Sequence, residues 1–559
     1  MEPNARDLSA AGLPKGPAWA VLDEAVAAFA SRPCIDFLGK RWTYAEIGDL
    51  VERAAKGFQD LGVGPGVRVG LCLPNTPYAI VAFFGVLKAG GTVVNYNPLY
   101  VERELANQIE DSGTSIMVTM DLALIYPKVA GLLGRTSLKT IVVCPMAAVL
   151  PFPKRQLFPI LRRKELAAIP DDARHVKWDR LLAAKGARPV TVDPDRDVAV
   201  LQYTGGTTGV PKGAMLTHGN LSAQLEQMRR VIPKAEPGYE KLLCVLPLFH
   251  VFAMSVGMFL GLKLGAELIL LPRFELAQVI DVVARKRPTL FPGVPTLYAA
   301  INTAMENAPV DLTSLKYCIS GGAPLPAEIL KAFEARSGCR LVEGYGLTEC
   351  SPVVAVNPLD APGKAGSIGK PVPGTTIEIR SPDDGSLVPE GEKGELCILG
   401  PQVMAGYWNR PEETKAVFRG PALRTGDVGY RDPDGFIFIV DRIKDLILCS
   451  GFNVYPRVIE EALYQHPAVS EAVAIGVPDP YRGQAPKAFV TLRADASARP
   501  EDLMAFLAGY LSRIEMPKEI EIRDTLPKTM IGKLSKKELV AEEAAKAGQG
   551  AQARQGETA

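Results

Sequence analysis

The sequence is poor in the residues that mark several classes of protein. Its 559 residues include only four His, and aromatic residues make up 7%. The His residues, at positions 175, 218, 250 and 466, do not have metal-ligand spacing, so a His-based zinc enzyme is not expected. Charge of one sign is not in excess, since 63 Lys and Arg stand against 62 Asp and Glu. A general nucleic-acid binder usually carries surplus basic charge, so that class of partner is excluded.

Cysteine is present, but it forms no pattern. The nine Cys residues are dispersed, with no Cys-x-x-Cys pair. An odd, scattered set is typical of reduced thiols and argues against a disulfide framework. Residues 1–19 lack a basic region followed by an apolar core, so no signal peptide is expected. We therefore expect a cytoplasmic protein, and peripheral contact with the inner face of the membrane stays open at this point.

One long apolar run tests this interpretation. No Asp, Glu, Lys or Arg lies between Lys241 and Lys263, which makes the run a formal candidate for a membrane span. However, it contains Pro247 and His250 and continues into a strand-like segment. Buried core is therefore favoured over a membrane span.

Helical and strand-like segments alternate along most of the chain. Residues 44–63 have apolar side chains at helical spacing, 68–75 are typical of a short strand, and 77–90 are typical of a buried helix. This alternation predicts α/β layers with largely buried sheets. After about Gly366, short strands separated by Gly, Pro and Asp predict a β-rich subdomain. From Lys444 onward, the pattern predicts a small α/β unit.

The predicted fold class is therefore α/β. We expect a large multi-layer N-terminal domain over 1–441, made of two α/β subdomains and a β-rich subdomain. A small α+β C-terminal domain is expected over 442–543. Residues 544–559 have no apolar periodicity and are expected to form a disordered tail.

Residues 151–170 combine five basic residues with a group of large apolar ones. One interpretation is an interfacial patch that meets acidic lipid. The other, slightly favoured by the charge pattern, is a solvated loop with a few packed anchors. The apolar residues are Phe152, Leu157, Phe158, Ile160 and Leu161.

The most informative stretch is YTGGTTGVPKG, residues 203–213. Glycines let backbone N–H groups approach phosphate oxygens closely, Thr hydroxyls add donors, and Lys212 adds a positive charge. The stretch fits neither a Walker A motif nor a Rossmann fingerprint. Turns use the same residue types, but eleven such residues after an apolar strand favour a polyphosphate cradle. The candidate ligands are Thr204, Gly205, Gly206, Thr207, Thr208, Gly209 and Lys212.

This stretch resembles the phosphate-loop signature of the adenylate-forming superfamily, which includes acyl-CoA synthetases, luciferases and peptide-synthetase adenylation domains. Further signatures follow in the family's order: SGGAPLP, EGYGLTE, LRTGD, VDRIKDLI, GFNVYP and LPKTMIGKLSKKEL. Within the superfamily, EGYGLTECSPVVAVNP and GPQVMAGYW look most like bacterial long-chain fatty acyl-CoA synthetases. The resemblance implies ATP-dependent activation of a carboxylic acid to an acyl-adenylate, followed by transfer of the acyl group to coenzyme A.

The resemblance also implies roles for individual residues. Glu349 would provide a carboxylate for Mg²⁺, which prefers oxygen ligands, and Thr348 would contact the α-phosphate. Lys533 would offset charge that develops between the substrate carboxylate and the α-phosphate. Asp427 would accept hydrogen bonds from the ribose hydroxyls, and Arg442 would add a charged contact to the ribose or phosphate region. Taken alone, each of these residues also has an ordinary interpretation: a helix N-terminal turn for Thr348 and Glu349, a turn Asp, and a solvated Lys.

Two further sets follow from the resemblance. Small residues and an aromatic face would form a shelf for adenine, while His250, Val294 and Gly322 would border the acyl pocket; a lone His in an apolar run is as readily a packed core residue. Lys444 matches the hinge of a mobile small domain, whose other face would form a pantetheine channel. The shelf residues are Gly321, Gly322, Ala323, Glu343, Gly344, Tyr345 and Gly346, and the channel residues are Gly451, Phe452 and Asn453.

The implied partners are a fatty acid, ATP with Mg²⁺, and coenzyme A, and a homodimer is a further possibility. An aryl- or medium-chain acyl-CoA ligase would carry the same motifs. A fatty-acid binding or uptake protein that has lost catalysis is an alternative of another class. Leu448 stands where some relatives carry Lys in the second domain orientation, which leaves the second half-reaction less fully supported.

Overall fold

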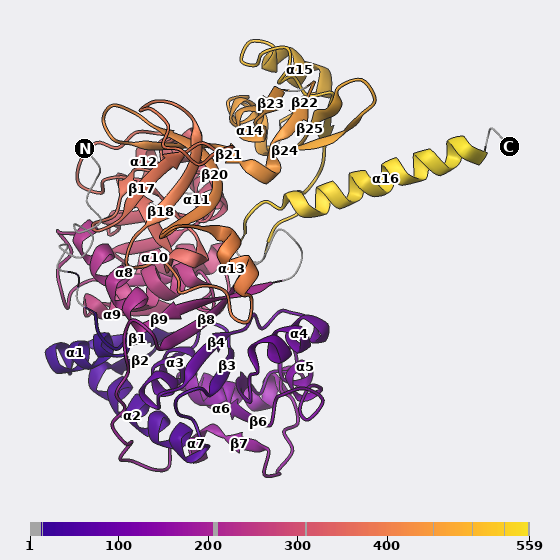
Figure 1. The fold of residues 1–559 in the computed structure, drawn as a ribbon. Coiled ribbons are helices and arrows are strands. Elements are labelled where there is room, and N and C mark those ends of the chain that lie inside the picture. The colour runs from indigo at the N-terminus through magenta and orange to yellow at the C-terminus, as the bar shows by residue number, and fades with distance from the viewer. Residues whose placement is uncertain are drawn as a thin grey trace.

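The computed structural model describes residues 13, 15–204, 211–307, 310–450, 452–494, 496–529 and 532–556. Figure 1 shows a large body and, above it, a smaller unit built by the C-terminal part of the chain. The larger hydrophobic core of the large body has buried members from Ala18 to Ile437, and a second core there has members from Cys72 to Leu201. A separate cluster, with members from Ile447 to Ile520, lies in the C-terminal unit.

The first large sheet has seven strands in the order β7-β6-β5-β3-β4-β8-β9. All neighbours are parallel except β9, which runs antiparallel to β8. The predicted helix from Tyr44 is confirmed as α2 (Tyr44–Asp60), which begins with a capping box between Thr43 and Glu46. The strands are β3 (Arg68–Cys72), β4 (Thr92–Asn95), β5 (Ile116–Met120), β6 (Thr140–Cys144), β7 (His175–Lys177), β8 (Val198–Thr204) and β9 (Lys212–Thr217). The helices are α3 (Pro77–Lys88), α4 (Glu102–Ser112), α5 (Tyr126–Ala130), α6 (Lys154–Leu161) and α7 (Trp178–Leu181).

The second large sheet has nine strands in the order β16-β15-β14-β13-β12-β10-β11-β1-β2. Its six central strands are parallel, and β2, β15 and β16 pair antiparallel at the edges. The strands are β1 (Pro33–Phe37), β2 (Lys40–Thr43), β10 (Lys241–Cys244), β11 (Glu267–Leu270), β12 (Leu290–Gly293), β13 (Tyr317–Ser320), β14 (Leu341–Gly346), β15 (Val353–Val356) and β16 (Lys370–Pro371). The helices are α1 (Ala20–Phe29), α8 (His218–Val231), α9 (Leu260–Lys263), α10 (Leu276–Lys286), α11 (Pro295–Asn307) and α12 (Ala327–Ser337).

The uncharged run after Lys241 is core, as predicted. It forms β10, then a π-helix, η4 (Ala253–Phe259), in which every residue is buried, and then α9. The Phe259 ring packs edge-on against that of Phe83 on α3, with centroids 5.7 Å apart. Within the part of the chain that the structure describes, no helix is both long and apolar enough to cross a membrane.

The predicted β-rich region is a five-stranded sheet, in which β17, β18, β20 and β19 follow one another and β21 pairs with β20. A second five-stranded sheet forms the C-terminal unit, ordered β23-β22-β25-β24 with β26 beside β25. The first comprises β17 (Thr376–Arg380), β18 (Gly394–Leu399), β19 (Phe418–Arg419), β20 (Ala422–Arg431) and β21 (Ile437–Arg442), with α13 (Pro411–Val417). The second comprises β22 (Ile447–Cys449), β23 (Phe452–Val454), β24 (Val469–Asp479), β25 (Gly483–Leu492) and β26 (Glu519–Ile522), with α14 (Pro456–Tyr464) and α15 (Pro500–Leu507).

The structure describes residues 544–556 of the tail predicted to be disordered, and it gives them as the end of a helix. Helix α16 (Lys536–Gly556) continues through most of that tail and points away from the rest of the molecule (Figure 1). Residues 544–556 include five Ala and three Gln, which favour a helix without needing a packed face, beside three Gly, which do not. A lack of apolar periodicity therefore excludes packing of this segment against a core, but it does not exclude helix formation.

Candidate active site

The Gly/Thr-rich stretch connects two antiparallel strands, β8 and β9. Thr204 ends β8, Lys212 begins β9, and the two residues pair in register across the hairpin. The two ends of the loop are therefore held beside each other at the edge of the seven-stranded sheet. The candidate ligands Gly205, Gly206, Thr207, Thr208 and Gly209 lie outside the described residues.

Residues 404–408 add an extended segment along the far side of β9. The main-chain N–H of Trp408 donates to the carbonyl oxygen of Gly213 at 2.8 Å. Within the segment, the Tyr407 ring faces Lys212, whose Nζ lies 5.2 Å from the ring centroid. Lys212, expected to meet phosphate, is thus held over an aromatic face, where a cation is attracted to the ring.

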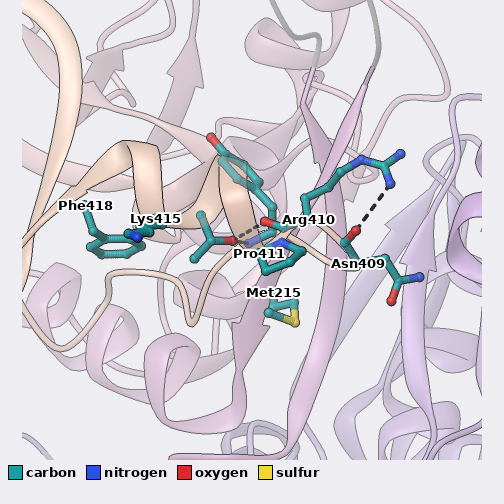
Figure 2. A pocket seen from close by; sticks show the side chains of 8 residues that line it. Met215, Asn409, Arg410, Pro411, Lys415 and Phe418 are labelled. Carbon is teal, nitrogen blue, oxygen red and sulfur yellow. Dashed lines mark hydrogen bonds between the residues drawn. The ribbon is translucent and has the colours of Figure 1, made fainter.

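The same tyrosine reaches the candidate metal ligand. Thr348 and Glu349 lie on the short 3₁₀ turn η5 (Thr348–Cys350), directly after β14. The Tyr407 hydroxyl donates to Oε1 of Glu349 at 2.7 Å. Tyr407 also helps to line a cavity of about 450 Å³. Figure 2 shows the side chains around this cavity. Its other lining residues are Met215, Asn409, Arg410, Pro411, Thr414, Lys415 and Phe418.

The donor set around Glu349 fits a magnesium ion that binds together with a nucleotide. In the described part of the chain, no group of three or more His, Cys, Asp or Glu residues could hold a metal by itself. Mg²⁺ usually takes only one or two protein carboxylates, and phosphate oxygens and water complete its octahedron. A single carboxylate, placed near Lys212 through their shared contact with Tyr407, matches that pattern.

The expected adenine shelf is formed by the ends of two neighbouring parallel strands. Gly321, Gly322 and Ala323 follow β13, while residues 343–346 are the last four of β14. Gly322 has φ +80°, a conformation that favours glycine. At Gly346, a Cβ would lie 2.2 Å from the carbonyl oxygen of Pro352, so no side chain fits there.

Asp427 lies at the centre of a polar group. Its carboxylate is buried, accepts a hydrogen bond from the Tyr345 hydroxyl, and accepts another from Nε of Arg442 at 2.9 Å. The Arg442 bond is charge-assisted and fixes one carboxylate oxygen. The Asp427 carboxylate and the Tyr345 ring are therefore oriented together, although the two residues lie on different sheets.

Lys533 comes from the C-terminal unit and reaches this group. Its Cε lies 3.7 Å from the position that a Cβ on Gly322 would occupy. Burial, and then the positive charge of Arg442, lower the pKa of the Lys533 ammonium to about 8, although Asp427 opposes the shift. Lys444, on the turn η6 (Ile443–Asp445), also has a lowered pKa, because of burial and then Arg442.

His250 and Val294 lie on the side of the site expected to take the acyl chain. Burial, and then the positive charge of Lys533, lower the pKa of His250 to about 4. His250 is therefore neutral at pH 7. Val294 is buried, and its methyl groups lie 3.8 Å and 3.7 Å from the Cβ positions that Gly322 and Gly532 lack.

Glu343 has a different environment from the rest of the shelf. It is buried at the end of β14, and burial raises the pKa of its carboxyl to about 7, although Arg457 on α14 opposes the rise. Arg457 also bonds Glu461 on its own helix, at 2.8 Å from Nε to Oε1. Arg457 of the C-terminal unit therefore lies near enough to the end of β14 to act electrostatically on Glu343.

The hairpin formed by β22 and β23 is not part of this assembly. Leu448 pairs with Asn453 and Cys449 with Phe452, and the Leu448 and Phe452 side chains are exposed. Gly451 lies outside the described residues, and so does the side chain of Asn453. The structure therefore brings Lys533, and not the face expected to form a pantetheine channel, to the site.

For two residues of the site, Tyr407 and Thr296, the sequence patterns predict no role. Tyr407 is inside the motif GPQVMAGYW, but nothing local indicates that its hydroxyl meets Glu349. Thr296, at the start of α11, donates from Oγ1 to the carbonyl oxygen of Gly532 at 3.0 Å. Both contacts join positions far apart in the chain, so no spacing pattern could reveal them.

Comparisons with protein families agree with this geometry. Residues 22–408 match the model of the AMP-binding enzyme family, and residues 458–533 match the AMP-binding enzyme C-terminal domain. A long-chain-fatty-acid–CoA ligase from Bacillus subtilis is 42% identical over 535 residues, covering 95% of each chain. A feruloyl-CoA synthase from Amycolatopsis is 36% identical over 502 residues, covering 90% of this chain and 94% of the relative.

The solved structures extend the likeness to three dimensions. ATP-bound MatB from Rhodopseudomonas palustris superposes with a TM-score of 0.82 at 27% identity, covering 94% of this chain and 98% of MatB. The match spans both the large body and the C-terminal unit.

Proposed function

Because the chain belongs to the AMP-binding enzyme family, we propose that it is an AMP-forming long-chain fatty-acid–CoA ligase. In the first half-reaction, a carboxylate oxygen of the fatty acid attacks the α-phosphorus of ATP, which expels pyrophosphate and leaves an acyl-adenylate. In the second, the coenzyme A thiolate attacks the acyl carbon, forming the thioester and releasing AMP. The observation that carries this proposal is the placement of Lys533 over Gly322, beside the Asp427–Arg442 pair.

The residues of the site divide the work of the first step. Lys212 and the end of β8 at Thr204 would hold the β- and γ-phosphates, and Asp427 would hold the ribose. The Lys533 ammonium would stabilise the negative charge that builds up between carboxylate and α-phosphate. Like other transfers at phosphorus, the step depends mainly on positioning and charge neutralisation.

Magnesium and coenzyme A are the further components that we propose. Glu349 would hold Mg²⁺, which neutralises phosphate charge when it is bound. Thr348, on the same turn, would orient the α-phosphate by a hydrogen bond from its hydroxyl. Coenzyme A would enter after the small domain, residues 442–543, rotates about Lys444 relative to 1–441 and brings the β22–β23 hairpin towards the site. The exposed Phe452 is available for that contact.

The acyl group distinguishes the proposal from its two alternatives. The likeness to long-chain ligases favours a long alkyl chain, which the apolar side chains around Val294 and η4 would accommodate. The similarity to a feruloyl-CoA synthase supports the alternative, an aryl substrate. A binding protein without catalysis would not need a partly buried ammonium beside a nucleotide site, so this arrangement favours an enzyme.

Two assays test the proposal. Pyrophosphate release should depend on palmitate and ATP, and thiol consumption should follow when coenzyme A is added. A panel from acetate to oleate, with cinnamate and ferulate, should give the highest kcat/KM for long alkyl acids. A maximum at an aryl acid would establish the alternative, and ATP binding without pyrophosphate release from any acid would indicate the non-catalytic protein.

The exposed surface around α6 supports a further part of this proposal, contact with anionic lipid. Phe152, Ile160 and Leu161 are 79%, 74% and 71% exposed, and no residue of α6 is buried. Arg155 lies close enough to Lys40 to help lower the pKa of that lysine, after burial. A helix with exposed apolar and basic residues is suited to the boundary between lipid headgroups and acyl chains. The remaining basic residues are Lys154, Arg162, Arg163 and Lys164.

Vesicle sedimentation tests this contact. The protein should bind vesicles that contain phosphatidylglycerol more strongly than vesicles of phosphatidylcholine alone. The double variant Ile160→Ser/Leu161→Ser should weaken that binding, whereas Leu387→Ser, a change at an exposed leucine of the β-rich region, should not. Equal binding of the double variant and the unmodified protein would contradict the contact.

The nine Cys are all free and buried, which fits the cytoplasmic location that we propose.

A further inference from the structure

We propose that Tyr407 is the positioning residue of the metal site: its hydroxyl orients Glu349 for Mg²⁺ while its ring holds Lys212 for phosphate. The inference rests on the proposed function, in which Glu349 binds the metal. It concerns a residue that would touch neither the metal nor the nucleotide, and that acts through two residues that would.

The first support is the hydrogen bond to the carboxylate. The Tyr407 hydroxyl donates to Oε1 of Glu349 at 2.7 Å. With Oε1 engaged in this way, Oε2 is the oxygen left to face a cation, so the bond would favour monodentate coordination. Carboxylates that bind metals are commonly fixed by such a donor, and its loss typically lowers metal affinity by about 10–100-fold.

The second support is the backbone around the pair. The main-chain N–H of Met404 donates to the carbonyl oxygen of Glu349 at 2.8 Å. Glu349 is thus tied to residues 404–408 by its main chain as well as by its side chain. The segment in turn bonds β9 through Trp408 and Gly213. Residues 404–408 therefore link the turn η5 at one end to strand β9 at the other, and this link restricts movement of η5 relative to the β8–β9 hairpin.

The third support is the cation on the ring. Nζ of Lys212 lies 5.2 Å from the Tyr407 ring centroid. Tyr407 is 8% exposed, so solvent screens this contact only weakly. One side chain therefore contacts two groups of opposite charge, an ammonium expected to meet phosphate and a carboxylate expected to meet the metal. A Mg²⁺–nucleotide complex has both a cation and phosphate groups. Binding it therefore requires a carboxylate and an ammonium that are held at a fixed distance from each other.

The variant Tyr407→Phe isolates the hydroxyl. It keeps the ring over Lys212 and removes only the donor to Glu349. The matched control is Tyr203→Phe, on strand β8 of the neighbouring hairpin. The Tyr203 hydroxyl also donates to a carboxylate, Oδ2 of Asp111 at 2.6 Å, but it does not contact Glu349. Both variants lose one phenolic hydroxyl that is bonded to an acid, and only one of them loses the bond to the proposed metal ligand.

The readout is equilibrium binding of ATP without fatty acid, measured with excess Mg²⁺ and again with EDTA. For the unmodified protein, Mg²⁺ should tighten ATP binding. In Tyr407→Phe the ratio of the two affinities should fall by about 10-fold or more, with affinity in EDTA little changed, whereas Tyr203→Phe should keep the ratio of the unmodified protein. A comparison of thermal unfolding midpoints confirms that both variants are folded.

Each other result overturns the inference. An unchanged ratio in Tyr407→Phe would show that the hydroxyl does not act on the metal. An equal fall in both variants would show a general loosening of the hairpin. If Glu349→Gln abolishes the Mg²⁺ effect while Tyr407→Phe does not, the metal role of Glu349 stands and only the role of Tyr407 fails. If Mg²⁺ has no effect on ATP binding by the unmodified protein, the metal part of the proposed function fails as well.

Discussion

The hydroxyl of Thr296 donates a hydrogen bond to the carbonyl oxygen of Gly532, with 3.0 Å between the two oxygens. Thr296 begins α11 in the large body, and Gly532 directly precedes Lys533 in the C-terminal unit. The bond therefore helps to hold the ammonium of Lys533 at the site. Because it joins the two parts of the molecule in one orientation, the bond should matter for only one of the two half-reactions.

We predict that Thr296→Val lowers the rate of acyl-adenylate formation by roughly fivefold, because one hydrogen bond contributes about 1 kcal/mol. The rate of thioester formation from a preformed acyl-adenylate and coenzyme A should be unchanged. Single-turnover assays of each half-reaction measure both values. Equal loss in the two steps would indicate a general defect of packing rather than the loss of one domain orientation.

The lowered pKa of Lys533 predicts how adenylation depends on pH. Burial and Arg442 bring this pKa down to about 8, and the protonated ammonium is the form that stabilises negative charge. The kcat/KM for pyrophosphate release should therefore fall as pH rises through about 8, since kcat/KM reports the pKa values of the free enzyme. Lys533→Arg should move this fall to higher pH, because a guanidinium stays charged.

The variant Lys533→Ala should lose roughly 10²–10³-fold in the rate of adenylation, the usual cost of removing one group that stabilises a transition state. ATP binding should remain, because Asp427 and Lys212 are untouched. Full activity in Lys533→Ala would contradict the proposed mechanism.

The buried carboxyl of Glu343 predicts a change of stability with pH. Burial raises its pKa to about 7, above the ordinary value near 4.3, so the folded protein binds more protons than the unfolded chain between these values. Glu343 therefore contributes stability that is fully present below about pH 4 and is lost as pH rises through about 7. Glu343→Gln stays neutral, so its unfolding midpoint relative to the unmodified protein should be higher at pH 8 than at pH 5.

Differential scanning calorimetry at both pH values measures this difference. Arg457→Gln is the companion variant, because Arg457 opposes the rise in the pKa of Glu343. Without the charge of Arg457, the ionised form of Glu343 should destabilise the folded protein more. The fall in unfolding midpoint from pH 5 to pH 8 should therefore be larger in Arg457→Gln than in the unmodified protein. A difference that is the same at both pH values would show that Glu343 does not titrate in this range.

The parts of the fold predicted from the sequence are those that local pattern determines. The helix from Tyr44 has a capping box and apolar residues at helical spacing, and the helix from Pro77 is apolar on all sides. The tail after residue 543 lacks apolar periodicity, yet its residues as far as 556 continue α16, because helix propensity acts without such periodicity. The order of strands within the sheets depends on contacts between distant segments, which spacing along the chain does not encode.

The same division applies to the site. Asp427 and Lys533 could be proposed because each lies in a motif that resembles a family signature. That Asp427 bonds Arg442 could not, because β20 and β21 pair through backbone geometry that no single motif specifies. No pattern indicated the contacts of Tyr407 and Thr296, since their partners Glu349 and Gly532 lie far away in sequence.

The close approach at Gly346 gives a final prediction. A Cβ there would lie 2.2 Å from the carbonyl oxygen of Pro352, which is backbone and cannot rotate away. Gly346→Ala should therefore force a shift in the strand end that carries Tyr345 and leads to Thr348. We expect a loss of roughly 1–3 kcal/mol in the free energy of unfolding, the usual cost of overpacking, and a lower rate of adenylation.

Gly64→Ala is the matched control, because no atom lies within 4 Å of the Cβ position at Gly64 and its φ is not in the left-handed region. The same substitution there should leave stability unchanged or raise it by up to about 1 kcal/mol, since alanine restricts the unfolded chain. Urea unfolding of both variants, with pyrophosphate release measured in parallel, separates the two cases. Equal stability of Gly346→Ala and Gly64→Ala would mean that β14 accommodates the methyl group, and the strand end would then not be held as closely against Pro352 as the structure has it.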